Sequence, residues 1–477
     1  MTDFAAIIPI VIVALSATAA LLAEAFRQPG ERMPIGGLGL IGLTGAAVAS
    51  VFLWDRDATG FGAVRADNFA LFLNLVLCAV GILTILLSVS AIERERLPPG
   101  EYYSLLLFSI SGMMLMGAAT DLLVIFLALE VLSLGVYVLT GLRRTSAAGA
   151  EAAFKYFLLG AFSSAFFLYG IAFTFIVAGT TDLGQVGRAV AAESMAPGIP
   201  VALAAGLMLV GFGFKVSAVP FHMWTPDAYE GAPTVVTGFM STGVKAAAFA
   251  AFLRVFLSAL EPMREQWIPI VWGIAALTMV LGTVVGVVQS NVKRMLAYSS
   301  IAHAGYLLVG MVAANDAGKA AILFYLLAYA VTNLGAFGVV ALLGTADRPH
   351  DTLNDFAGLW NRRPALAAVM TVFLLSLGGL PPTAGFIGKW YIFSAAVEQS
   401  YYWLAIIGVL TSVVSVFFYL RIVVMMYMTE GPEEAAARPL SRPGIVALAI
   451  ALAGVVYLGV LPARVLDIAL DSIRTIF

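Results

Sequence analysis

The sequence predicts an all-α, polytopic integral membrane protein with about 14 transmembrane helices. Of its 477 residues, 61% are hydrophobic and only 11% are charged, and the mean hydropathy is +0.98. A soluble domain carries roughly a quarter of its residues as charged side chains. The missing charge is explained if most of the surface faces lipid. A near-neutral balance of 26 basic and 28 acidic residues also excludes an electrostatic nucleic-acid partner.

Apolar runs of about 18 to 25 residues are long enough to cross a bilayer as helices. They are predicted at 4–24, 35–54, 68–92, 101–119, 121–141, 152–178, 199–219, 234–258, 267–289, 294–313, 318–344, 366–398, 401–428 and 443–463. The first run has no basic residues before it, so we expect a first span and not a cleaved signal peptide. The last stretch, ARVLDIALDSIRTIF, is short and amphipathic, and we expect it at the membrane interface.

Basic residues in the loops predict the orientation, because cytoplasmic loops carry an excess of them. One set of alternate loops holds Arg27, Arg32, Arg94, Arg96, Arg143, Arg144, Lys293, Arg294, Arg348, Arg362, Arg363, Arg438 and Arg442. The other set holds fewer, mainly Arg56, Arg65, Arg188, Arg264 and Lys319. We expect the first set in the cytoplasm. An even number of spans then places both termini on the outer side.

Two spans contain proline in the middle of an apolar run. Pro220 follows GFGFKVSAV, and Pro381 and Pro382 lie within SLGGLPPTAGF. Proline lacks an amide donor and clashes with the carbonyl four residues earlier, here that of Val216 or Leu377. Such backbone survives at membrane depth only inside protein or beside water. We therefore predict discontinuous helices at the seventh and twelfth spans.

These breaks indicate an internal repeat. Spans four to eight and nine to thirteen form two five-helix sets, the broken helix is fourth in each, and the second helices carry Glu130 and His303. Sets with an odd number of helices enter the membrane from opposite sides, so the repeat is inverted, as in many transporters. The predicted units are an N-terminal three-helix segment (1–100), a first five-helix repeat (101–258), a second, inverted one (259–428), and a C-terminal helix with an amphipathic tail (429–477).

Lysine and arginine are distributed differently along the chain. Only six lysines occur, and four of them lie inside apolar spans, whereas nearly all arginines lie in loops or at helix ends. A buried lysine can exchange a proton near neutral pH, but arginine stays protonated. The four lysines are therefore candidates for a proton relay: Lys155, Lys215, Lys245 and Lys389. Snorkelling to the headgroups is the alternative, and it fits Lys155 better than the other three.

Three other titratable residues are candidates. Glu130 has no charged neighbour within eight residues and needs a basic partner, for which we expect Lys215; a purely structural ion pair is the alternative. His222, near the end of the broken seventh span, either supplies protons to a relay or caps the helix. His303 lies in a helix among serines and a tyrosine, which is typical of a polar, hydrogen-bonded lining.

The single cysteine, Cys78, lies in an apolar run, and the sequence holds no grouping of Cys and His that would bind an iron–sulfur cluster or zinc. Any electron-transfer centre is therefore expected on another chain.

Three segments carry a resemblance to a known family. GFGFKVSAVPFHMWTPDAYEGAPTVVTGFMSTGVKAA at 211–247 resembles the antiporter-like subunits of respiratory complex I, which resemble Mrp-type sodium/proton antiporters. NVKRMLAYSSIAHAGY at 291–306 and SLGGLPPTAGFIGKWYIF at 376–393 extend the resemblance, which with the helix count covers nearly the whole chain. Among the bacterial subunits L, M and N, the LPPTAGFIGKW block is similar to subunit N. Subunit M is expected to carry glutamate at 389, and subunit L a long lateral helix.

The resemblance implies five proton-pathway residues: Glu130, Lys215, Lys245, Lys389 and Lys155. Glu130 and Lys215 would be an interacting pair on helices five and seven. Lys245 on helix eight would be the central relay group and Lys389 on helix twelve the exit group, while Lys155 matches an additional lysine of subunit N. The supporting residues implied are His222, His303, Pro220, Pro381 and Pro382.

The implied activity is that of a non-redox subunit of a proton-translocating NADH:quinone oxidoreductase in a bacterial inner membrane. Its expected partners are the lipid bilayer and other membrane-arm subunits, including another antiporter-like subunit. Flavin and iron–sulfur clusters are expected on partner subunits, the quinone is expected elsewhere in the complex, and no cofactor is expected in this chain. The alternatives are a subunit of a stand-alone Mrp-type sodium/proton antiporter and a structural spacer with an inactive channel.

Overall fold

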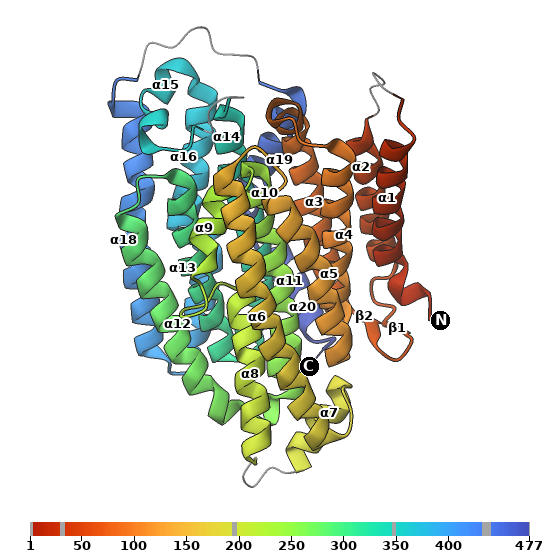
Figure 1. The fold of residues 1–477 in the computed structure, drawn as a ribbon. Helices are drawn as coiled ribbons and strands as arrows, with labels where there is room; N and C mark the ends of the chain where they lie inside the picture. Colours follow the sequence, from red (N-terminus) through yellow and green to blue (C-terminus); the bar gives the residue numbers. More distant parts are fainter. Residues whose placement is uncertain (1–2, 29–33, 193–197, 346–349, 432–439, 477) are drawn as a thin grey trace.

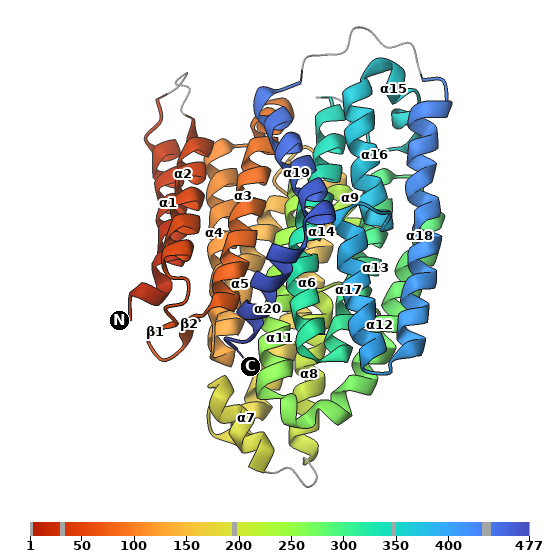
Figure 2. The ribbon, with the colours of Figure 1, turned by 180° about the vertical axis from the view of Figure 1, so that it is seen from behind.

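The computed structural model describes residues 3–28, 34–192, 198–345, 350–431 and 440–476. Long helices lie side by side in one elongated bundle, and no sheet layer interrupts it (Figures 1 and 2). In chain order the helices are α1 Ile8–Ala25, α2 Ile35–Phe52, α3 Asn68–Glu95, α4 Pro99–Ala118, α5 Leu122–Thr140, α6 Ala147–Ala178, α7 Leu183–Ala192, α8 Ile199–Lys215, α9 Trp224–Gly231, α10 Thr234–Phe239, α11 Lys245–Arg254, α12 Arg264–Val287, α13 Val292–Ala313, α14 Asp316–Leu343, α15 Leu359–Arg362, α16 Pro364–Gly378, α17 Ala384–Glu398, α18 Tyr402–Met428, α19 Arg442–Val460 and α20 Ala463–Ile473.

Within the described ranges, 11 helices are long and apolar enough to cross a membrane. They coincide with 11 of the predicted segments, which confirms an all-α polytopic membrane protein. The other three predicted segments, 101–119, 199–219 and 366–398, correspond to α4, to α8, and to α16 followed by α17. In the last two, the helix is interrupted where the prolines predicted it: α8 ends at Lys215 before Pro220, and α16 ends at Gly378 before Pro381.

The helices α10 and α11 form one continuous, fully buried rod with two π-helical turns, Met240–Val244 and Val255–Ala259. A π-turn inserts one extra residue and changes the direction in which the following side chains point. The first π-turn lies directly before Lys245, so it sets the direction of that side chain.

A buried ion pair fastens the N-terminal helices to the rest of the bundle, and the sequence analysis did not predict it. Arg254 Nη2 lies 2.6 and 2.8 Å from the two carboxylate oxygens of Asp67, and Arg254 Nε donates to the carbonyl oxygen of Gly117 at 2.7 Å. Asp67 also accepts a hydrogen bond from the amide of Ala70 and so caps α3. Because the two charges are paired and the carboxylate also accepts an amide hydrogen bond, the cost of removing them from water is partly offset.

The connection between α2 and α3 was predicted only as a loop, but it forms a short hairpin. Strand β1 (Ala58–Gly60) pairs antiparallel with β2 (Val64–Ala66). Arg65 donates to both carboxylate oxygens of Asp57 at 2.6 and 2.7 Å, and this guanidinium lowers the pKa of the Asp57 carboxyl. The hairpin packs against the residues just before α1, at the lower ends of α1 and α2 in Figure 1.

The amphipathic C-terminal stretch is helical, as expected, and forms α20. It packs against α14 and α3 and buries Ala469, Ser472 and Ile473 against them. In Figure 2 it continues downward from α19 along the side of the bundle. Its inner face therefore contributes to the bundle instead of lying apart from it.

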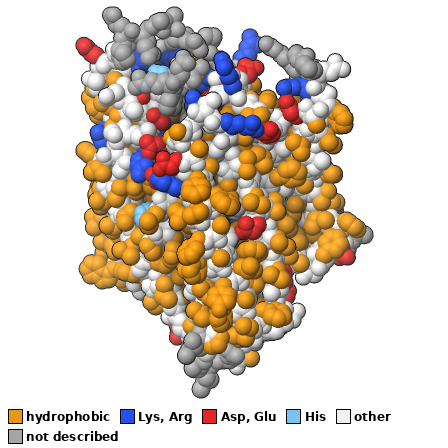
Figure 3. Space-filling model, in the orientation of Figure 1, with side chains coloured by type: hydrophobic (Ala, Val, Ile, Leu, Met, Phe, Trp, Pro, Cys, Tyr) orange, Lys and Arg blue, Asp and Glu red, His pale blue; other side chains and the backbone are white. Residues whose placement is uncertain are grey.

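The basic loops gather at one end of the bundle. The upper end in Figures 1 and 2 holds the C-terminal ends of α1, α3 and α18 and the N-terminal ends of α2, α4 and α19. Both chain termini lie nearer the lower end. Hydrophobic side chains cover most of the face in Figure 3, with charged groups gathered toward the upper part. Arg32, Arg348 and Arg438 of the predicted set lie outside the described residues.

Candidate proton-relay site

Lys215 is the last residue of α8, at the break of the seventh span. Its side chain is only 3% exposed, and its Nζ lies 5.1 Å from the ring centroid of Tyr137 and 5.3 Å from that of Tyr156. The unpaired carbonyls at the C-terminal end of a helix also favour a positive charge. The break and the two rings thus provide a protein environment for a buried ammonium group.

The direct contact expected between Glu130 and Lys215 is not formed. Among the described residues no ion pair within 4.0 Å joins them, and Glu130 Oε1 and Lys215 Nζ are both buried without a hydrogen-bond partner. The physical reason is aromatic packing: Tyr137 and Tyr156 occupy the space around the ammonium group, and their hydroxyls also lack hydrogen-bond partners.

Lys245 is 2% exposed and lies where the first π-turn ends. Its Nζ donates to the backbone oxygen of Ser300 at 2.5 Å and to the hydroxyl of Ser300 at 2.6 Å, and it lies 5.5 Å from the ring centroid of Tyr329. Lys245 therefore joins α11 to α13 through Ser300, deep in the bundle.

His303 lies three residues after Ser300 on α13, and the structure surrounds it with tyrosines. Its Nδ1 is 2.5 Å from the hydroxyl of Tyr325, and its Nε2 is 3.2 Å from that of Tyr419. The ring of Tyr306 lies 5.4 Å away, edge to face. Both imidazole nitrogens are therefore hydrogen-bonded, as the predicted polar lining requires.

Lys389 lies in α17, directly after the break of the twelfth span, and is 4% exposed. Its Nζ donates to the carbonyl oxygens of Leu377 and Gly378 at 2.8 and 3.2 Å and to the hydroxyl of Ser412 at 2.8 Å. The same Nζ lies 4.9 Å from the ring centroid of Tyr306, which also contacts His303. The ring of Tyr329 contacts both Lys245 and His303. Lys245, with its partner Ser300, is thus followed by Tyr329, His303, Tyr306 and Lys389 in one row of contacting groups, called the relay row below.

Lys155 has a different environment, because its side chain is 43% exposed and belongs to an ion-pair network. Its Nζ lies 2.6 Å from Glu151 and 2.8 Å from Asp227. Arg294 continues the network, 2.8 Å from both Asp227 and Glu230. These partners were not predicted from the sequence, although Asp227 and Glu230 are three residues apart and so share one face of α9.

His222 and Pro220 lie in the break between α8 and α9. His222 is partly buried, and its Nδ1 has no hydrogen-bond partner in the described structure, while the next residue, Met223, is 70% exposed. Among the described residues, no hydrogen bond, ion pair or ring contact joins His222 to the relay row. Pro381 and Pro382 are exposed in the second break, so both breaks reach the outside of the bundle.

Lys293 is a buried basic residue that the sequence analysis assigned to a loop. It is 3% exposed, and its Nζ donates to the carbonyl oxygens of Glu230 and Ala232 at 2.7 and 2.6 Å. These carbonyls lie at the end of α9, so Lys293 caps that short helix. Its position only two residues into α13 gave no indication of this partner.

Within the described part of the chain, no group of three or more His, Cys, Asp or Glu side chains is arranged to hold a metal ion. Cys78 is buried in α3.

Comparison with known proteins relates this geometry to a family. The family model described as "NADH:quinone oxidoreductase/Mrp antiporter, TM" matches residues 119–415, which include the relay row. NADH-quinone oxidoreductase subunit N of Trichlorobacter lovleyi is 46% identical over 471 residues, covering 98% of this chain and 97% of the relative. The chain belongs to the subunit N family.

Solved structures agree with this membership. A chain of respiratory complex I from Thermus thermophilus, solved with bound aureothin, is 36% identical, has a TM-score of 0.82, and aligns over 96% of this chain and 99% of its own length. A chain of the Mrp complex from Dietzia is 20% identical with a TM-score of 0.78, covering 98% of this chain and 96% of that one. At that identity the Mrp likeness shows a common fold alone. The solved structures therefore confirm the predicted antiporter-like fold. The membership of the subunit N family is shown by the sequence identity to its relatives.

Proposed function

We propose that the chain is the proton-translocating membrane-arm subunit N of a bacterial NADH:quinone oxidoreductase. In this role it couples electron transfer from NADH to quinone, carried out by other subunits, to proton transfer across the membrane. The single observation that carries the proposal is the buried relay row, found in a chain of this family. Buried lysines are costly at membrane depth, so two of them in one row favour a function in proton transfer over a purely structural one.

The relay row supports an order of events. A proton taken up from the cytoplasm loads Lys245, whose ammonium group is held by Ser300. It then passes along the tyrosine-lined His303 to Lys389 and leaves on the outer side. Each step needs a group that can both hold and release a proton, as lysine, histidine and water can.

The Glu130–Lys215 pair acts in this scheme as an electrostatic control on the relay. Four buried polar atoms without protein partners lie on Glu130, Lys215, Tyr137 and Tyr156. Buried polar groups of this kind are ordinarily satisfied by ordered water. Water between the two side chains would transmit a charge on Glu130 to Lys215 without a direct ion pair. His222, in the adjacent break, is proposed as a supporting group on the uptake side.

We also propose that the chain has about 14 membrane spans and contains two inverted repeats, and the number and order of its helices support this. The 11 candidate spans, together with α4 and the two broken helices, account for that number. Lys215 ends the first half of one broken helix, while Lys389 lies in the second half of the other and donates to the carbonyls that end its first half. In both sets a lysine therefore lies at the carbonyl end of a half-helix, which supports the proposed units 1–100, 101–258, 259–428 and 429–477.

The relatives' names support the cellular setting. The chain is proposed to lie in the bacterial inner membrane, with the loops of the larger basic set in the cytoplasm and both termini outside. Its neighbours would be other membrane-arm subunits, including another antiporter-like subunit. Flavin, iron–sulfur clusters and quinone would be bound by other subunits.

Co-purification tests the proposal against the Mrp-type alternative. An affinity-tagged chain isolated in mild detergent should bring with it peripheral subunits with flavin and iron–sulfur absorption. Isolation with membrane subunits alone, without NADH:quinone activity, would favour the Mrp-type antiporter. An inactive spacer is tested separately: complexes with Lys245→Ala, reconstituted in sealed vesicles, should move fewer protons per NADH oxidised than wild type, whereas a spacer predicts no change.

A further inference from the structure

A cavity of about 740 Å³ lies away from the relay row, at one end of the bundle. The lining residues come from the start of α12, from the α13–α14 connection and from the segment before α18. They are Arg264, Glu265, Ile268, Pro269, Trp272, Ala313, Ala314, Asn315, Gln399 and Tyr401. None of them takes part in the proton pathway proposed above.

The helix boundaries place this cavity at the edge of the membrane. Arg264 begins α12, Ala313 ends α13, Asn315 caps α14, and Tyr401 directly precedes α18. All four helices belong to candidate spans, so their ends mark the depth at which the bilayer meets water. Further along α12 and α18, exposed apolar side chains mark their outward faces, among them Ile270, Leu277, Ile406 and Leu410.

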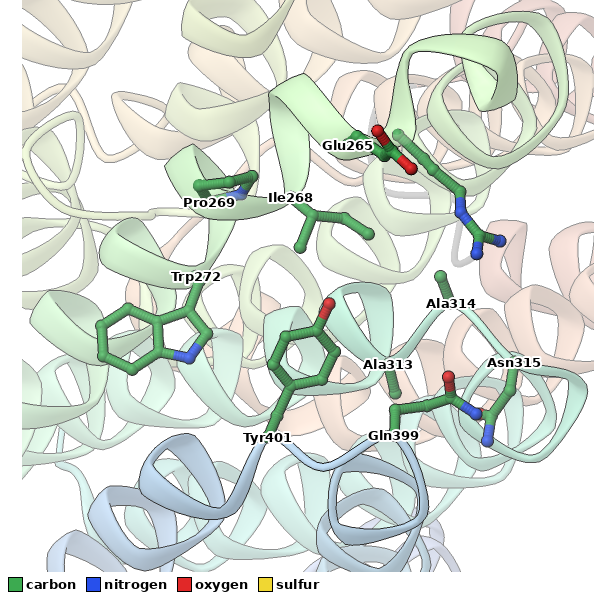
Figure 4. Close-up of a pocket in the computed structure, with 10 residues that line it drawn as sticks. Glu265, Ile268, Pro269, Trp272, Ala313, Ala314, Asn315, Gln399 and Tyr401 are labelled. Atoms are coloured by element: carbon green, nitrogen blue, oxygen red, sulfur yellow. The ribbon is translucent and has the colours of Figure 1, made fainter.

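Apolar and polar groups occupy different ends of the cavity (Figure 4). Trp272 and Pro269 lie at one end, and Tyr401 projects its ring between the α12 side chains and the opposite wall. Glu265, Asn315 and Gln399 lie toward the other end. Such a lining fits an amphiphile whose apolar part contacts Trp272 and whose polar part reaches the side chains at the opposite end. Tryptophan and tyrosine are also typical of the membrane interface.

We propose that this cavity binds one phospholipid with a zwitterionic, phosphate–ammonium headgroup. The Arg264 guanidinium is suited to the phosphate because it offers paired donors. Its contact with Glu261 at 3.4 Å joins two side chains that are more than half exposed, and such pairs are weak and readily exchanged. Glu265, the next residue, supplies the negative charge for the ammonium group. An anionic lipid without an amine would instead face the Glu265 carboxylate unpaired.

Fluorescence of Trp272 gives a local measurement of binding. The purified complex that contains the chain is stripped of lipid and titrated with phosphatidylethanolamine carrying brominated acyl chains, which quench nearby tryptophan. The quenching due to Trp272 is obtained by subtracting the fluorescence quenching of the Trp272→Phe variant from that of the wild type. It should saturate, and Arg264→Gln should raise the half-saturating concentration roughly tenfold, as expected for loss of one charge-assisted contact.

Two comparisons make the test specific. Arg188→Gln removes an exposed arginine on α7 and should leave the titration unchanged. Glu265→Gln should weaken binding of phosphatidylethanolamine and strengthen binding of brominated phosphatidylglycerol. The proposal is overturned by quenching that does not saturate, by equal effects of Arg188→Gln and Arg264→Gln, or by tighter binding of phosphatidylglycerol than phosphatidylethanolamine to the wild type. Because the readout is lipid binding, these outcomes are independent of proton transfer.

Discussion

Lys389 Nζ donates a 2.8 Å hydrogen bond to the carbonyl oxygen of Leu377, the carbonyl that Pro381 deprives of its helical partner. The proline that breaks the helix therefore also prepares the site of the lysine. The ammonium group donates two further hydrogen bonds, to the carbonyl oxygen of Gly378 and to the hydroxyl of Ser412, so all three of its N–H donors are used. A protonated Lys389 is well satisfied here, whereas a neutral one leaves acceptors unused, so loading and unloading of this lysine changes the hydrogen bonding of the break.

Two substitutions of Lys389 distinguish the role of its positive charge from the role of its ability to release a proton. Lys389→Arg should allow assembly but abolish proton transfer through this chain, because arginine stays protonated. Lys389→Ala should also lower stability by about 1–3 kcal/mol, since buried carbonyls are left without a donor. Proton uptake per NADH oxidised in sealed vesicles and thermal unfolding of the complex provide the two measurements. Normal pumping by Lys389→Arg would rule out an exchanging role.

The Glu130–Lys215 pair should behave as a coupled unit despite the absence of direct contact. Glu130→Ala and Lys215→Ala should each impair pumping in complexes that still assemble, and the double variant should lose less than the two single losses added. Glu130→Gln should match Glu130→Ala, because charge is the property that matters. Quinone reduction and proton pumping are measured together for each variant. Strictly additive losses would mean that the two residues act independently.

Lys155 should matter less than Lys245 for pumping. Lys155 is 43% exposed, and breaking exposed ion pairs costs about 0.2–1 kcal/mol each. Lys245 lies buried in the relay row. Single alanine substitutions are compared at equal abundance of the assembled complex. A larger loss with Lys155→Ala would reverse the assignment and make the ion-pair network with Asp227 the central element.

His303 should be required for transfer between the two lysines. His303→Leu removes the contacts to Tyr325 and Tyr419 and leaves a group that cannot carry a proton, so pumping should fall at least about tenfold. Tyr325→Phe, which removes one hydroxyl but keeps the ring, serves as a matched control and should have a smaller effect. If both variants lose pumping equally, His303 supports the packing and does not act as a relay group.

The orientation can be tested by cysteine labelling. Thr145, exposed in the connection between α5 and α6, is changed to cysteine, and Gln185 on α7 is changed in a second variant. A membrane-impermeant thiol reagent should label Thr145→Cys only from the cytoplasmic side and Gln185→Cys only from outside. Cys78 is buried and gives little background. The reverse pattern would invert the proposed topology.

Features that depend on one short stretch of chain could be predicted from the sequence. Hydropathy over about 20 residues decides whether a helix can span the bilayer. Proline in the middle of an apolar run removes a backbone donor and clashes with the preceding turn, so interruptions near Pro220 and Pro381 could be expected from the local sequence. The lysines of the relay row also stood out, because a charge inside an apolar run is visible without any partner. His303 could be predicted to lie in a polar lining because serines and a tyrosine are close to it in the sequence.

Contacts between distant helices were decided only by the tertiary structure. Arg254 and Asp67 are 187 positions apart, and Lys155 and Asp227 are 72 apart. No local pattern specifies which apolar faces will meet, because many such faces are nearly equivalent in lipid. Glu130 and Lys215 are not directly bonded for this reason, since the rings of Tyr137 and Tyr156 surround the ammonium group. The sequence thus determined the membrane helices, their breaks and their buried charges, while side-chain packing between helices decided which charges have partners.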